Sequence, residues 1–94
     1  MSNDNNDNLE KKLYIGNLPY SVDEGGLRLL IKEKGFEVVE ITLVRDRETG
    51  ESKGFGFVEF SDDIQAVKAM DILNDLELEG RKLRVDKARP RKYF

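Results

Sequence analysis

The order in which strand-like and helix-like segments follow one another limits this chain to very few folds. Short runs of β-branched and aromatic residues predict strands, and apolar residues at helical spacing predict helices. Strands are predicted over residues 13–18, 38–44, 54–60 and 81–87, with a helix after the first strand and another after the third. A chain with this order folds as a four-stranded antiparallel sheet with both helices on one face. We therefore predict an α+β, ferredoxin-like β-α-β-β-α-β sandwich.

Capping residues set the expected bounds of the two helices. Ser21 and Glu24 fit a capping box at the start of the first helix, and Asp23 is an alternative cap. Gly35 marks the end of that helix. Ser61 is the predicted cap of the second helix. The apolar stripe of the second helix consists of Ala66, Val67, Ala69, Met70 and Leu73.

Composition removes whole classes of function. The chain has no cysteine, which excludes a disulfide framework, and no histidine, the commonest general base and zinc ligand. No apolar run approaches the roughly 18 residues of a membrane span, and the first seven residues lack the pattern of a secretory signal. We expect a soluble intracellular protein, cytoplasmic unless nuclear or organellar, that needs no membrane, metal, cofactor or small-molecule substrate.

Three regions differ in composition. Residues 1–11 are rich in Asn and Asp and show no apolar periodicity, so we predict a flexible leader. Residues 12–88 form the expected domain, in which 74–79 is a turn with a minor extended piece. Residues 89–94 are a basic tail.

The charge of the chain is unevenly distributed. The net charge is −3, yet residues 81–94 hold seven Lys or Arg against the single Asp86. Residues 1–80 therefore carry nine positive and 18 negative charges. Such asymmetry indicates a polyanionic partner at the basic end, although a basic tail that only aids solubility is an equally good explanation on composition alone.

Alternation along the strands assigns aromatic rings to the face that the helices leave open. In the third strand one face takes Gly54, Gly56, Val58 and Phe60, and the other takes Lys53, Phe55, Phe57 and Glu59. In the first strand Leu13 and Ile15 point inward, while Lys12 and Tyr14 point outward. The reversed assignment would bury Lys53 and Glu59 under the helices, which is costly for unpaired charges. Exposed apolar groups of this size usually mark a binding surface.

Two segments resemble the paired motifs of a known family. Residues 13–18, Leu-Tyr-Ile-Gly-Asn-Leu, are similar to the hexamer of the RNA recognition motif, and residues 53–60, Lys-Gly-Phe-Gly-Phe-Val-Glu-Phe, match its octamer at every position. The resemblance covers residues 12–88 and includes Gly80-Arg81. The segment 87–91 is also similar to small single-domain members from bacteria and organelles.

The resemblance implies that single-stranded RNA lies across the sheet of a monomer. Tyr14 and Phe57 would stack on bases, Phe55 would pack on a sugar, and Lys53 would contact phosphate. Base edges would be read by Lys12, Asn17, Thr42, Arg84 and the chain near Lys87. In the tail, phosphate would be contacted by Arg89, Arg91 and Lys92. The preference for RNA over single-stranded DNA stays open, because it depends on contacts to the 2′-hydroxyl.

The chain departs from the family pattern at three places. Ile31 stands where an aromatic residue is more frequent, Asp75 stands where glycine is frequent, and Gly25-Gly26 replaces an acidic helix start. These departures concern packing and turn geometry, not the stacking residues.

Two other functions are alternatives to RNA binding. An enzyme is disfavoured, because the only carboxylates expected on the open face are Glu59 and Asp86, which are better explained as charge-screening or base-edge groups. A protein-interaction module of the same fold is the stronger alternative. It would use the acidic residues of segment 61–79, in which six Asp or Glu accompany Lys68, although a solvated helix face is the better explanation of these charges.

Overall fold

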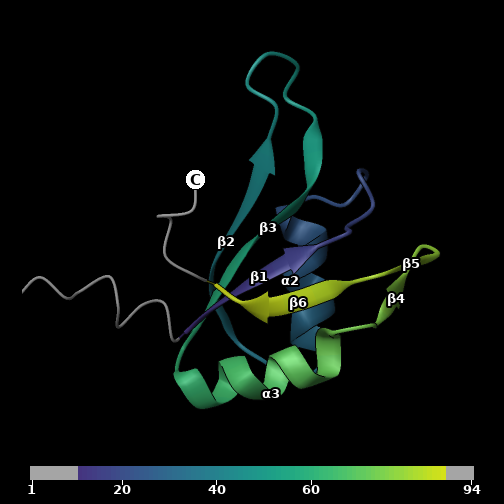
Figure 1. Cartoon of the computed structure of the whole chain (residues 1–94). Coiled ribbons are helices and arrows are strands. Elements are labelled where there is room, and N and C mark those ends of the chain that lie inside the picture. Colours follow the sequence, from purple (N-terminus) through teal and green to yellow (C-terminus); the bar gives the residue numbers. More distant parts are fainter. Residues whose placement is uncertain (1–10, 89–94) are drawn as a thin grey trace, which may run out of the picture.

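The computed structural model describes residues 11–88, and residues 1–10 of the leader and the whole basic tail lie outside the described residues. Four antiparallel strands form one sheet in the order β2-β3-β1-β6. These strands are β1 (Lys12–Gly16), β2 (Val38–Arg45), β3 (Ser52–Phe60) and β6 (Arg84–Lys87). Two helices, α2 (Glu24–Glu33) and α3 (Asp63–Leu73), pack on the same side of the sheet, which leaves the other face uncovered (Figure 1). The predicted ferredoxin-like fold is confirmed.

The core lies between the helices and the covered face of the sheet. Leu27 and Ile31 of α2 are buried, as is the apolar stripe of α3 except at Val67 and Met70. The sheet contributes Leu13, Ile15, Leu43, Val58, Phe60 and Val85. The inward assignment of the first and third strands is therefore correct. Val67 was wrongly placed in the stripe: it is exposed because Ala66 and Ala69 already fill the side of α3 that faces the sheet.

Aspartates, not serines, cap both helices. Asp23 accepts a hydrogen bond from the backbone N–H of Gly26 at 2.8 Å, and Asp62 accepts one from Gln65 at 2.8 Å. The alternative cap at Asp23 is thus the correct one, and the caps predicted at Ser21 and Ser61 are wrong. Ser21 lies in the turn that precedes the helix, where its hydroxyl donates to Glu79 Oε1 at 3.0 Å. The first helix ends at Glu33, and Gly35 beyond it takes the left-handed conformation, with φ of +97°.

The last predicted strand is divided in two. Its first part, β5 (Arg81–Lys82), pairs with β4 (Glu77–Leu78) in a separate two-stranded hairpin, and only β6 joins the main sheet. The division falls at Leu83, which is fully buried and exchanges backbone hydrogen bonds with Asp75 and Leu76. The hairpin turn has positive φ at both central residues, Glu79 and Gly80, as two-residue hairpins of type I′ require.

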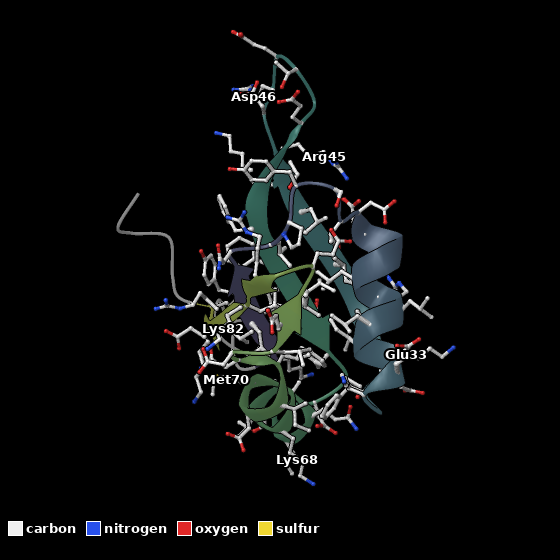
Figure 2. All side chains as sticks on the ribbon, turned by 90° about the vertical axis from the view of Figure 1, so that its right-hand side faces the viewer. Glu33, Arg45, Asp46, Lys68, Met70 and Lys82 are labelled. Atoms are coloured by element: carbon white, nitrogen blue, oxygen red, sulfur yellow. The ribbon has the colours of Figure 1, made fainter. Side chains whose placement is uncertain are left out.

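The connection between β2 and β3 projects beyond the rest of the fold (Figure 1). Asp46 Oδ1 accepts the backbone N–H groups of Glu48 at 2.8 Å and Thr49 at 3.1 Å, and Gly50 completes the turn with φ of +79°. Figure 2 shows Asp46 on this projecting hairpin, far from Lys68, which points away from the fold at its opposite end. The hairpin is therefore held by its own hydrogen bonds.

Candidate nucleic-acid interface

Three aromatic rings lie together on the open face of the sheet. Tyr14 of β1 is paired directly with Phe57 of β3, and their ring centroids are 6.0 Å apart at 63°. Phe55, two residues before Phe57, brings its ring centroid to 5.9 Å from that of Tyr14. All three side chains are half-buried, because each ring covers part of its neighbours while one side stays in contact with solvent. We call Tyr14, Phe55 and Phe57 the aromatic platform.

Glycines at residues 16 and 56 permit two close approaches in this part of the sheet. A Cβ atom on Gly16 would meet the Tyr14 hydroxyl and lie 2.8 Å from Tyr14 Cζ, so the ring can extend along β1 only because residue 16 has no side chain. A Cβ atom on Gly56 would meet the Thr42 carbonyl and lie 2.7 Å from Leu43 Cδ2. Glycine at residue 56 therefore lets β2 approach β3 closely, on the face opposite the rings.

Polar and charged residues surround the platform at positions that the strand register fixes. Thr42 is paired with Phe57, Lys12 with Glu59, and Arg84 with Gly16. These pairings place all three predicted base-edge residues on the same face as Tyr14. Asp86, paired with Tyr14, and Glu59 also lie there, as the sequence predicted.

Lys53 occupies the start of β3, where the register between β2 and β3 is interrupted. The interruption coincides with Gly54, which has φ of +84°. Lys53 is exposed. The Glu48 and Thr49 N–H groups lower the pKa of the Asp46 carboxyl, and the charge of Lys53 adds to this effect. Lys53 is thus an accessible cation between the platform and the β2–β3 hairpin.

The positions of Lys87 and Asn17, both predicted near the base edges, limit how their side chains can contact RNA. Lys87 is paired with Leu13, so its side chain lies on the helix side of β6 and not beside the aromatic platform. Alternation from the buried Val85 carries residue 87 to the covered face. The predicted base contacts of the chain near Lys87 therefore stay a prediction for its backbone. Asn17 uses its amide within the fold: Nδ2 donates to the Lys82 carbonyl at 2.8 Å, and Oδ1 accepts from Arg81 at 3.1 Å.

Residues 89–94 are outside the described part of the chain, which leaves the predicted phosphate contacts of the tail as predictions. Within residues 11–88 no three metal-ligating side chains come together. In the same residues no helix is long and apolar enough to cross a membrane.

A sheet of four antiparallel strands, backed by two helices and carrying aromatic rings on its free face, is the architecture of a class of RNA-binding domains. Comparison with known proteins identifies the family. The family described as RNA recognition motif matches residues 13–84. The chain belongs to the RNA recognition motif family.

Relatives and solved structures agree with this assignment. A 29 kDa chloroplast ribonucleoprotein B from Nicotiana sylvestris is 44% identical over 85 residues, which are 88% of this chain and 29% of the relative. The crystal structure of RNA Binding Protein PG1 has a TM-score of 0.77 at 44% identity and covers 86% of this chain and 96% of its own. A structure of the Rna15 RRM with bound RNA (GU) has a TM-score of 0.75 at 30% identity and covers 85% of this chain and 84% of its own.

Proposed function

We propose that this chain binds single-stranded RNA across the open face of its sheet. The observation that carries the proposal is the aromatic platform, in which the ring centroids of Phe55 and Phe57 lie 5.9 and 6.0 Å from that of Tyr14 on a face that the helices leave uncovered. Unpaired bases offer π-faces to such rings, and each stack contributes about 1–3 kcal/mol. The solved Rna15 RRM with bound RNA (GU), a relative of this fold, supports the proposal.

The platform and the residues around it contact either the sugar-phosphate backbone or the bases of the RNA. In our proposal Tyr14 and Phe57 stack on bases, Phe55 packs on a sugar and Lys53 contacts a phosphate. Base edges are read by Lys12, Thr42 and Arg84, together with the backbone beside Lys87. The tail residues Arg89, Arg91 and Lys92 add phosphate contacts, which position the strand without specifying its sequence.

Asn17 is better explained as a positioning residue than as a reader of base edges. Its amide oxygen and nitrogen are both engaged with β5. These two hydrogen bonds fix the orientation of the amide and leave it one N–H and one oxygen lone pair for other contacts. In our proposal Asn17 holds the β4–β5 hairpin against the end of β1.

A protein-interaction function is the second candidate, and the acidic side chains near α3 favour it. Asp62, Asp63 and Asp71 are exposed. Neither candidate requires catalysis, a cofactor or a metal, and we propose that the chain acts as a monomeric binding domain. Its relative from Nicotiana sylvestris is a chloroplast protein, so an organelle joins the cytoplasm as a proposed location.

An NMR titration with short RNAs of randomised sequence tests the proposal, with single-stranded DNA of equal length as the comparison. We expect shifts of backbone resonances in β1 and β3, larger for RNA than for DNA if 2′-hydroxyl contacts contribute. A matched control is Ile72→Ala, which removes an exposed apolar side chain from α3 and should leave the titration unchanged. Shifts confined to α3 would contradict RNA binding on the sheet.

A further inference from the structure

The two ends of the described chain lie on neighbouring strands at the same end of the sheet. β1 begins beside the end of β6 (Figure 1), and the Ala88 N–H donates to the Lys12 carbonyl at 3.2 Å. Lys11, the residue before β1, is fixed from the other side, because its carbonyl accepts the Phe60 N–H at 2.8 Å. Residues 1–10 of the leader and residues 89–94 of the tail are therefore attached about one strand spacing apart, roughly 5 Å.

The two segments attached at this place carry opposite charges. Residues 1–10 contain three carboxylates and no Lys or Arg, and residues 89–94 contain three cations and no Asp or Glu. The carboxylates are those of Asp4, Asp7 and Glu10, and the cations are those of Arg89, Arg91 and Lys92. Lys87 adds a described cation next to the tail. It is exposed and lies on the helix side of β6, so its side chain does not serve the proposed RNA site.

The lengths of the two segments allow these charges to meet. An extended chain spans at most about 3.3–3.6 Å per residue, so Asp4, which precedes Lys11 by seven residues, reaches up to about 25 Å from it. The cations of the tail lie one, three and four residues after Ala88. Two segments tethered at neighbouring points meet at an effective concentration on the order of millimolar. Ion pairs too weak to join separate molecules are therefore populated within one chain.

From this arrangement we infer that the acidic leader pairs with the basic end of the same chain, formed by Lys87 and the tail, and competes there with RNA. The inference rests on the proposed function, in which the tail contacts phosphate. Carboxylates and phosphates are alternative anionic partners of the same Lys and Arg side chains. RNA therefore has to displace the leader before the tail contributes to binding. The leader is an intramolecular competitor that weakens RNA binding at low salt.

Paramagnetic relaxation in the full chain tests the contact without RNA. The chain has no cysteine, so Ser2→Cys provides a single site for a nitroxide label. The matched control is the same labelled chain with a neutral leader (Asp4→Asn, Asp7→Asn, Glu10→Gln), which keeps the tether and removes the charge. We expect the label to broaden the backbone amide resonances of Lys87 and of the tail more strongly with the acidic leader than with the neutral one. High salt should remove the difference.

A mixture of nitroxide-labelled chains and isotope-labelled chains without nitroxide distinguishes contacts within one chain from contacts between chains. It should show no broadening at Lys87 or in the tail. Equal broadening with the acidic and the neutral leader, or broadening that also occurs in the mixture, would overturn the inference.

Fluorescence anisotropy with a labelled pool of short single-stranded RNAs tests the competition. The neutral leader should tighten RNA binding by about three- to tenfold at low salt, the effect of removing a few surface ion pairs. A second triple variant removes the same charge from exposed residues of segment 61–79 and is the control: Asp63→Asn, Asp71→Asn and Glu77→Gln. The control variant should tighten binding by less than about twofold, through long-range attraction alone. Melting temperatures establish that each variant is folded.

The competition requires the cations of the tail. In a chain with Arg89→Gln, Arg91→Gln and Lys92→Gln, the neutral leader should have no larger effect than the control variant. If the neutral leader and the control variant have equal effects with the natural tail, the inference is wrong and RNA binding on the sheet stands. If the natural protein binds no RNA in these titrations, the proposed function itself fails, and the competition fails with it.

Discussion

Tyr14 and Phe57 face each other across directly paired positions of β1 and β3, with ring centroids 6.0 Å apart at 63°. Each ring is thus partly shielded by the other, although neither belongs to the core. Contacts of this kind contribute about 0.5–1.5 kcal/mol beyond the burial of area. The platform therefore adds a little to stability while keeping ring faces available to a ligand.

Alanine substitutions in the platform should affect binding more than folding. Tyr14→Ala, Phe55→Ala and Phe57→Ala should each weaken RNA binding by about 1–3 kcal/mol. Each should lower the free energy of unfolding by about 0.5–1.5 kcal/mol, the value of the ring contacts. Phe60→Ala, which empties a fully buried position of the same strand, should cost about 3–5 kcal/mol. Urea unfolding and fluorescence anisotropy measure the two quantities. A loss of stability for Phe57→Ala as large as that for Phe60→Ala would contradict the open-face assignment.

Charge reversal on the helical side should leave the sheet functional. Asp71→Lys combined with Glu77→Lys changes two exposed side chains, neither of which belongs to the four-stranded sheet. RNA binding should persist and become slightly tighter at low salt through long-range attraction. Anisotropy titrations at two salt concentrations measure the effect. If RNA binding disappears while the circular dichroism spectrum is unchanged, the binding site lies on the helical side.

Deletion of residues 89–94 should lower the salt dependence of RNA binding. Three phosphate contacts by Arg89, Arg91 and Lys92 correspond to a slope change of about 0.7 each, or roughly two units in all. Base preference should hardly change, because phosphate contacts position the strand while base edges specify it. The logarithm of the association constant against the logarithm of salt concentration gives the slope. An unchanged slope with poorer solubility would indicate a tail that serves solubility alone.

Acid should destabilise the fold in part through Glu24. The backbone N–H at the start of α2 lowers the pKa of Glu24 below its ordinary value of 4.5, and the ion pair with Arg45, at 2.7 Å, lowers it further. A carboxylate whose pKa is lower in the folded state adds stability above its unfolded pKa and loses it as the pH falls through the folded pKa. Glu24→Gln should therefore flatten the fall in stability below about pH 4.5, measured by urea unfolding. Arg45→Gln should give an intermediate profile, because the backbone contribution remains.

Replacement of Asp75 by glycine should stabilise the fold. Asp75 has φ of 70°, a conformation that glycine adopts without the steric cost of a Cβ atom. This geometry explains why the position accepts the glycine that is frequent in the family, and why an aspartate is tolerated there. We expect Asp75→Gly to raise the free energy of unfolding by about 0.5–1 kcal/mol and Asp75→Val to lower it by a similar amount. A decrease for Asp75→Gly would show that the aspartate side chain makes a stabilising contact.

Most of what the sequence could predict of the site came from the alternation of side chains along the strands. Side chains along β3 alternate between the two faces of the sheet. This alternation places Phe55 and Phe57 on the open face and Val58 and Phe60 in the core. Charges at Lys53 and Glu59 settle the direction of the assignment. These are local properties, so they can be read from a single strand.

The features that sequence patterns missed depend on contacts between distant segments. Leu83 divides the last strand because it pairs with Asp75 and Leu76, and residues 81–87 alone do not reveal this pairing. Tyr20 and Arg81 are 61 positions apart and meet only after the β4–β5 hairpin is tied to Asn17. The local sequence pointed to this region only through Gly80-Arg81, which belong to the resemblance to the family.

Asn17 has a consequence for the thermodynamics of binding. By linking the end of β1 to β5, it restrains a loop and a hairpin that would otherwise have to be ordered when a ligand arrives. Gly16 likewise allows Tyr14 to take its extended position before any ligand is present. Ordering interface side chains costs about 0.5–1.5 kcal/mol each in an unorganised site. For Tyr14, and for the loop and hairpin that Asn17 links, this ordering precedes association, so their conformational entropy is not lost when an RNA strand binds.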